Sequence, residues 1–163
     1  MAGQHTLNET EGEVAARLGG LELDYEAMAV TSNLFRAANA VRNHLERTVL
    51  AKSDLTWTAF VVLWVVWIWE PIETRGIAAE GGFSKATLSG VLTTLESRGF
   101  LTRERSPADG RLVLVSLTPS GRRLMKKLFP EFNQEERNIT RHITAADLPQ
   151  AAQILRDLTR ATE

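Results

Sequence analysis

One stretch of the chain concentrates side chains that can bind a polyanion. Its cations are Lys85, Arg103, Arg105 and Arg111, and its hydroxyls include Ser84, Thr87, Ser89 and Thr93. Ammonium and guanidinium groups form charge-assisted hydrogen bonds with phosphate, whereas hydroxyls reach either phosphate oxygens or the edges of bases. These residue types favour nucleic-acid binding, although charged side chains on a surface are often only solvated.

Catalytic chemistry has weaker support. The three histidines, His5, His44 and His142, are scattered and lack the i, i+4 spacing of a metal site. The sequence contains no cysteine, which excludes thiolate metal sites and thiol redox sensing. Gly81 and Gly82 do not follow a predicted strand, so they do not form a dinucleotide-binding loop. We therefore expect a protein that is not an enzyme and has no metal site and no cofactor.

The charge distribution points to the same stretch. A formal net charge of -1 would by itself argue against a nucleic-acid partner, but residues 84 to 127 carry a local balance of +6, whereas residues 1 to 30 carry -5. The basic residues of segment 84–127 are Lys85, Arg98, Arg103, Arg105, Arg111, Arg122, Arg123, Lys126 and Lys127, and its acidic residues are Glu96, Glu104 and Asp109. A polyanion responds to charge within a Debye length of about 8 to 10 Å, so the local balance matters more than the total.

A helix must present the first of these side chains. Ser84 can cap its first turn, and apolar residues recur with helical spacing up to the stop at Gly99. These apolar residues are Leu88, Val91, Leu92 and Leu95. The opposite face carries Lys85, Ala86, Ser89, Gly90, Thr93 and Ser97, which are small or polar and so suit the floor of a DNA groove.

A hairpin must present the three arginines, Arg103, Arg105 and Arg111. Two short apolar and charged runs, 101–105 and 112–117, are joined by S-P-A-D-G-R, which is rich in turn residues. A helix followed by a hairpin with a basic tip is typical of a winged helix-turn-helix, in which the helix enters the major groove and the hairpin reaches the backbone or the minor groove.

Five motifs follow one another from Ile77 to Gly121: a short leading helix, S-K-x-T-L-S, L-E-x-R-G-F-L, a wing with D-G-R, and L-T-P-S-G. Their order and spacing resemble the MarR family of transcriptional regulators, and the likeness extends loosely from about Asp24 to the C-terminus. The resemblance implies a mainly α fold (α+β winged helix) that binds a palindromic double-stranded DNA operator as a homodimer.

The resemblance also implies the DNA-binding residues. The candidates are Ser84, Lys85, Ala86, Thr87, Ser89, Gly90, Thr93, Arg103, Arg105, Asp109 and Arg111. In the family the arginine at the place of Arg111 enters the minor groove. Asp109 would be repelled by phosphates, so we expect it to hold Arg111 or a backbone amide of the wing. The alternative is an ordinary turn aspartate beside a solvated arginine.

Two positions depart from the family pattern. Relatives usually place a large apolar residue at the position of Gly81, so we expect the missing volume to be filled by Trp64 or Trp67. Many relatives carry a longer polar or basic side chain at the position of Gly90, so closer backbone approach could replace base contacts there.

The single domain, residues 1–163, has a DNA-binding lobe at 55–118 and flanking helices with more apolar face than that lobe can cover. In the resembled family such helices form the dimer, so we assign dimerisation to 24–51 and 119–163. We also predict a short helix at 8–20 with Asn8 and Glu11 as its capping box. Pro130 should kink or interrupt the helix after Thr118, and Thr144 should begin the last helix.

A helix rich in tryptophan is predicted at 57–69, capped by Thr56 and closed by Glu70-Pro71. Its apolar run is too short for the roughly 20 residues that span a bilayer, and the polar N-terminus is no secretory signal, so we expect a cytoplasmic protein without a membrane partner. Core packing is the default role of its aromatic residues. The alternative is a pocket for a small aromatic effector at Trp57, Phe60 and Trp64.

The sequence thus predicts a sequence-specific DNA-binding regulator, a homodimer on a palindromic operator and a repressor modulated by a small ligand. The alternative is a winged-helix module used for protein assembly without DNA binding. An assembly module would have no reason to keep cations at Lys85, Arg103, Arg105 and Arg111 together.

Overall fold

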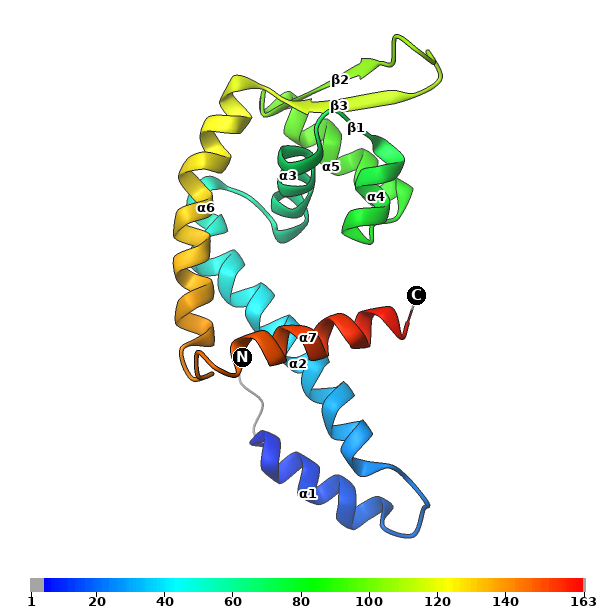
Figure 1. Cartoon of the computed structure of the whole chain (residues 1–163), viewed down its shortest axis with the longest axis vertical. Coiled ribbons are helices and arrows are strands. Elements are labelled where there is room, and N and C mark those ends of the chain that lie inside the picture. Colours follow the sequence, from blue (N-terminus) through cyan, green and yellow to red (C-terminus); the bar gives the residue numbers. More distant parts are fainter. Residues whose placement is uncertain (1–4, 163) are drawn as a thin grey trace. The chain divides into compact units, whose positions relative to one another are not determined.

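The computed structural model describes residues 5–162, which form seven α-helices, one short 3-10 helix and three strands. In chain order they are α1 (Leu7–Leu18), α2 (Tyr25–Thr48), η1 (Leu50–Ser53), α3 (Trp57–Trp69), β1 (Ile72–Glu73), α4 (Thr74–Gly81), α5 (Lys85–Ser97), β2 (Leu101–Arg105), β3 (Val113–Leu117), α6 (Pro119–Thr140) and α7 (Leu148–Arg160) (Figure 1). The mainly α winged-helix fold predicted from the sequence is confirmed. Contacts divide the chain into two units after Asn43, and each unit is described by itself.

The N-terminal unit holds α1 and most of α2. α1 begins at Leu7 rather than at residue 8, because Thr6 and Glu9 form the capping box, so the assignment of that role to Asn8 and Glu11 was wrong. Glu11 instead accepts a hydrogen bond from the Asn33 amide of α2 at 2.7 Å. Sequence alone could not separate the two pairs, because both have the spacing of a capping box.

The second unit is built around α3, which packs against α4, α5, α6 and β3. Thr56 caps it as predicted, accepting a hydrogen bond from the Ala59 amide at 3.2 Å. The most completely buried large side chains of this unit are Leu45, Leu50, Val62, Leu63, Val66, Ile77, Leu92, Leu95, Leu101, Val115 and Met125. They come from every element between the end of α2 and the first half of α6 except β1, so burial of this core holds the winged-helix lobe together.

The turn between α4 and α5 is made by Gly82, whose φ of 64° is in the left-handed region that glycine favours. The expectation that Trp64 or Trp67 fills the space beside Gly81 is wrong. A Cβ added to Gly81 would lie 2.2 Å from the Phe83 ring, so Phe83 occupies that volume. Trp64 stacks instead on Phe129, with ring centroids 4.5 Å apart.

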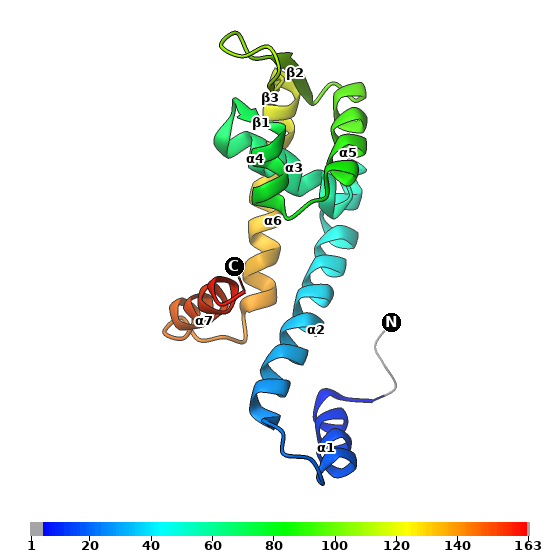
Figure 2. The same ribbon diagram turned by 90° about the vertical axis from the view of Figure 1, so that its right-hand side faces the viewer.

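The three strands form an antiparallel sheet in the order β1-β3-β2. β2 and β3 pair along their full lengths, from Leu101 opposite Leu117 to Arg105 opposite Val113, and β1 adds a short edge that the sequence pattern did not predict. The β2–β3 hairpin projects past the helices of this lobe in both views (Figures 1 and 2). Its tip therefore lies clear of the core.

The last two helices differ from their predictions in detail. α6 runs without interruption through Pro130, although an interior proline costs one backbone hydrogen bond. Packing offsets that cost, because Phe129 and Phe132 on either side of Pro130 stack on aromatic rings of α3. α7 begins at Leu148, and Thr144 forms a turn before it in which its hydroxyl lies 2.6 Å from the Asp147 carboxylate.

Candidate nucleic-acid interface

Helix α5 presents the predicted polar face. Ser84 caps the helix by accepting a hydrogen bond from the Thr87 amide at 3.1 Å, and Leu88, Leu92 and Leu95 are buried against the core. The face opposite the core is exposed at Lys85, Ala86, Ser89, Gly90, Thr93 and Ser97. This division into a buried face and an exposed face was predicted from the sequence and is confirmed.

The hydroxyls on α5 are not equally available. Those of Thr94 and Ser97 donate to backbone carbonyls of their own helix, at 3.0 and 2.8 Å, and those of Ser84 and Thr87 lie 2.8 Å apart. Within residues 5–162, by contrast, the Lys85 ammonium and the Ser89 hydroxyl have no hydrogen-bond partner or ion pair. A Cβ at Gly90 would meet nothing within 4 Å, so an outside molecule can approach the backbone there.

The wing tip is organised by Asp109. One carboxylate oxygen accepts hydrogen bonds from the Arg111 amide at 3.0 Å and from Arg111 Nε at 3.1 Å, and the other accepts from the guanidinium at 3.0 Å. These contacts are the internal role expected for Asp109. The Arg111 side chain is nevertheless 89% exposed, so one edge of the guanidinium is held while the rest faces solvent.

The pair also shifts the protonation of both groups. Hydrogen bonds from the Arg111 side chain and amide lower the pKa of the Asp109 carboxyl below its ordinary value, because they stabilise the charged form. The same contact raises the pKa of Arg111. Both groups are therefore charged at neutral pH, and the wing carries an ion pair rather than a lone cation.

The other two wing arginines also have internal partners. Arg103 reaches back to α5, where Nε donates to Glu96 at 3.0 Å, and this hydrogen bond lowers the pKa of the Glu96 carboxyl. Arg105 donates to the Gly110 carbonyl at 3.1 Å. Arg103 therefore has a structural role in joining the wing to α5, which weakens the inference that all four cations are kept only for DNA.

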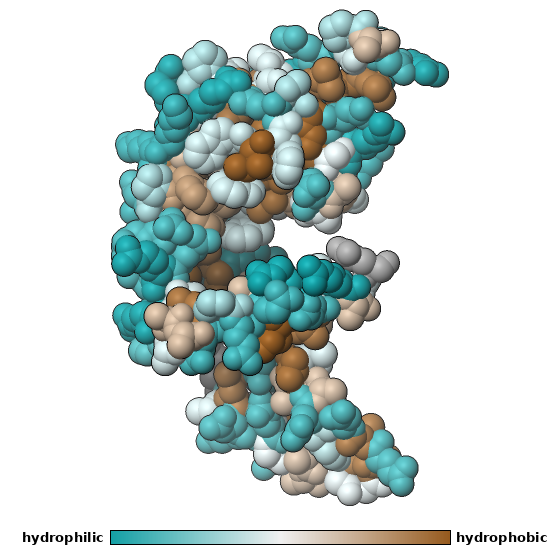
Figure 3. Space-filling view, viewed as in Figure 1, coloured by the Kyte–Doolittle hydropathy of each residue, from teal (hydrophilic) through white to brown (hydrophobic). Residues whose placement is uncertain are grey.

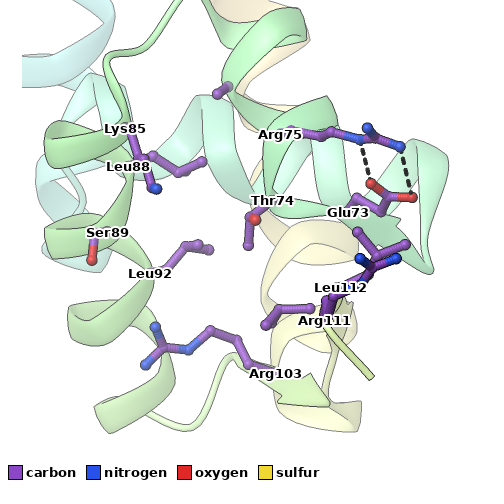
Figure 4. Close-up of a pocket in the computed structure, with 12 residues that line it drawn as sticks. Glu73, Thr74, Arg75, Lys85, Leu88, Ser89, Leu92, Arg103, Arg111 and Leu112 are labelled. Carbon is purple, nitrogen blue, oxygen red and sulfur yellow. Dashed lines mark hydrogen bonds and ion pairs between the residues drawn. The ribbon is translucent and has the colours of Figure 1, made fainter. Parts of the chain in front are cut away.

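A hollow of about 500 Å³ lies between α5 and the wing. Figure 4 shows Leu88 and Leu92 of α5 pointing into it, with Arg103 and Arg111 coming from the wing. Its lining also includes Glu73, Thr74, Arg75, Ala78, Lys85, Ser89, Leu112 and Val113. The exposed face of α5 and the wing thus border one continuous concave surface.

Sequence reasoning missed Glu73 and Arg75, which line this hollow. Arg75 is 81% exposed, and its Nε lies 2.5 Å from a Glu73 oxygen. An arginine in the first turn of the leading helix could have marked this position, since such a helix lies beside the one that enters the groove. Glu73 gave no signal of its own, because it belongs to the short strand β1, which the sequence pattern did not predict.

The aromatic residues proposed as an effector pocket are packed. Phe60 stacks on Phe132 with ring centroids 4.3 Å apart, Trp57 lies 6.2 Å from both, and Trp64 stacks on Phe129. These contacts correspond to the packing interpretation, in which the rings join α3 to α6. An effector site at Trp57, Phe60 and Trp64 stays a prediction.

Comparison with known proteins decides the family. Residues 55–113 match the model of the MarR family. The HTH-type transcriptional regulator YwaE of Bacillus subtilis strain 168 is 40% identical over 122 residues, covering 75% of this chain and 71% of YwaE. The chain belongs to the MarR family. This MarR-family chain is a DNA-binding transcriptional regulator of the helix-turn-helix type.

More distant comparisons agree. The regulator MgrA of Staphylococcus aureus is 28% identical over 96 residues, which cover 59% of this MarR-family chain and 65% of MgrA. The structure of BpsR from Bordetella bronchiseptica, whose DNA binding is regulated by 6-hydroxynicotinic acid, has a TM-score of 0.73 and 28% identity, covering 80% of this chain and 98% of BpsR. Among residues 5–162, no helix has both the length and the hydropathy that a membrane span needs.

Proposed function

We propose that this regulator binds a palindromic operator as a homodimer, with α5 of each protomer in the major groove and each wing over the adjacent minor groove, and that a small ligand releases it. The observation that carries the proposal is the continuous surface formed by α5 and the wing, which Lys85 and Arg111 border with cationic groups. In this arrangement Lys85 and Ser89 contact bases and phosphates, and Ser84 lies at a helix N-terminus where phosphate is favoured.

The proposed dimer rests on apolar side chains left at the surface. On α7, Leu148, Ile154 and Leu155 are 38% to 50% exposed, and Figure 3 shows hydrophobic side chains among hydrophilic ones on this helix. In the N-terminal unit Phe35 is 71% exposed on α2. Apolar surface of this kind is typical of an interface, and a second copy of the chain would cover it under two-fold symmetry. Two-fold symmetry in turn requires a palindromic site with half-sites about one helical turn apart.

The proposed ligand is a small aromatic acid. Support comes from BpsR, because 6-hydroxynicotinic acid regulates the binding of BpsR to DNA. Trp57 and Trp64 are half-buried, so a planar ligand could displace part of their packing against α6. The assembly-module alternative is not favoured, because the relatives YwaE and MgrA are transcriptional regulators.

The direct test measures binding of the full chain to DNA flanking its own gene over a salt series. We expect tight binding to one palindromic segment, a mass of two chains in solution and a steep fall of affinity with salt, because each phosphate contact releases counterions. Equal affinity for flanking and unrelated DNA would contradict the proposal, as would a monomeric mass at micromolar concentration.

A further inference from the structure

Glu70 lies where three elements of the DNA-binding lobe meet. It forms the C-cap of α3, and its side chain is only 16% exposed. One carboxylate oxygen accepts a hydrogen bond from the Leu117 amide of β3 at 2.6 Å. The other lies 2.7 Å from the guanidinium of Arg122 in the first turns of α6. A single carboxylate therefore joins the end of α3, the end of the wing and the start of α6.

Arg122 completes the junction. Besides its ion pair with Glu70, it donates a hydrogen bond to the Leu117 carbonyl. β1 pairs with β3 only at Leu114 and Val115, so it does not extend to Leu117. Beyond the last residue that β1 pairs with, Glu70 thus accepts from the amide of Leu117 and Arg122 donates to its carbonyl. The two side chains therefore take the place that a longer β1 would occupy at this edge of the sheet.

Further contacts surround the start of α6. Thr118 caps the helix and its hydroxyl donates to the Gly99 carbonyl at 2.6 Å, just after α5. A Cβ added to Gly121 would lie 2.0 Å from the Phe100 carbonyl oxygen, so the helix sits directly on the loop that ends α5. The start of α6 is therefore held against the end of α5 at this junction.

We infer that the Glu70–Arg122 pair is a positioning element that sets the distance between the two recognition helices of the dimer, and thereby the half-site spacing that the operator must have. The inference rests on the proposed homodimer, in which α6 links each DNA-binding lobe to the dimer contact. α6 has 22 residues, hence a length of about 33 Å, so a tilt of roughly 5° at its start displaces its far end by about 3 Å. The rise per base pair is similar, about 3.4 Å, so small changes at the junction matter for spacing.

The first experiment measures this distance without DNA. Because the sequence has no cysteine, Gly90→Cys places one spin label on each α5, at an exposed position where a Cβ meets nothing. Pulsed electron paramagnetic resonance then gives the label-to-label distance in the full-length dimer. We expect one narrow distribution in the otherwise unchanged protein, and a shifted or clearly broader one when Glu70→Gln is added.

Two further variants separate positioning from general destabilisation. Arg122→Lys keeps the charge but cannot hold Glu70 and the Leu117 carbonyl with one planar group, so it should also broaden the distribution. Glu131→Gln is the matched control, because it removes the same charge from α6 at an exposed pair with Lys52, and it should leave the distribution unchanged. If Glu70→Gln fails to fold, Arg122→Lys decides alone.

The second experiment measures spacing on DNA. Operators selected by the full chain are lengthened or shortened by one base pair between the half-sites, which we expect to cost the parent protein about tenfold in affinity. In Glu70→Gln or Arg122→Lys this penalty should fall below about threefold or the optimum should move, with affinity for the best spacing retained. A structural role alone would lower affinity equally for every spacing.

The outcomes are separable. Parental distance distributions and parental spacing profiles in both junction variants would overturn the inference while leaving the proposed function intact. A parent protein that is monomeric or that shows no preferred DNA would overturn the proposed function itself. A change caused equally by Glu131→Gln would show that the effect does not belong to the junction.

Discussion

Helix α5, the proposed recognition helix, and the wing present two different kinds of surface. On α5 the available groups are short and unpaired, with Ser89 and the open backbone at Gly90 beside the single long side chain of Lys85. On the wing the groups are long and already paired, Arg111 with Asp109 and Arg105 with a carbonyl. In the proposed complex the helix therefore approaches bases closely, whereas the wing presents charge in a fixed geometry that costs less ordering on binding.

The largest expected effect is on the helix. Ser89→Asp should weaken operator binding by about a hundredfold or more, because a carboxylate would face phosphates and base acceptors on a close-fitting surface. Thermal stability and dimer mass should stay unchanged, since Ser89 is exposed. The matched control is Ser89→Asn, which has the same size without charge and should lose much less affinity. Parental binding by Ser89→Asp in a fluorescence titration would show that α5 does not dock through this face.

The next effect is on the wing. Arg111→Ala should lower affinity by about tenfold and reduce the salt slope by about one unit per protomer, because one cation per wing no longer releases counterions. Preference for A·T-rich flanks should also fall, since narrow minor grooves attract arginine. Arg111→Lys should restore the salt slope without restoring the flank preference. A mutant with both the parental affinity and the parental preference would exclude the wing from DNA reading.

A smaller effect tests whether the pairing of the wing matters. Asp109→Asn keeps the shape of the turn but removes the carboxylate that holds Arg111. We expect affinity for unrelated DNA to rise, because a negative charge has gone, and the preference for A·T-rich flanks to fall by about threefold, because Arg111 must now be ordered on binding. Changes of the same sign in both quantities would contradict this account of Asp109.

The contrast between the two elements also predicts how α5 reads bases. Residues 84–97 contain no arginine, asparagine or glutamine, which are the usual bidentate base readers, so methyl contacts from Ala86 should contribute to recognition. Replacing thymine by uracil at the contacted positions removes one methyl group and should cost about threefold. In Ala86→Gly the same replacement should have almost no further effect. Additive effects in this cycle would show that Ala86 does not touch a thymine methyl.

The smallest effect is on the titration of Asp109 in its pair with Arg111, which carboxyl carbon NMR can measure. The folded-state pKa of Asp109 is lowered, so the pair is stabilising above the ordinary value of 3.8 and this contribution is lost as pH falls through the lowered pKa. In Arg111→Ala the Asp109 carboxyl should titrate closer to 3.8. An unchanged Asp109 titration would mean that the contact with Arg111 is not maintained in solution.

The sequence by itself determined the elements whose signals are local. The hydroxyls of Ser84, Thr56 and Thr118 cap the helices that follow them, because capping depends on residues within one turn. Helical spacing of apolar residues gave the buried and exposed faces of α5, and the turn residues around Asp109 gave the hairpin. These features follow from backbone and neighbour preferences that hold in most tertiary contexts.

Only the tertiary structure decided how these elements are joined. Along α6, packing on α3 lets the helix tolerate Pro130, and Arg103 binds Glu96 of the helix before it. Glu70 meets its partners 47 and 52 residues further along the chain, at Leu117 and Arg122. Contacts at that separation arise only when the core packs, because burial of apolar surface, rather than local preference, determines which distant side chains meet.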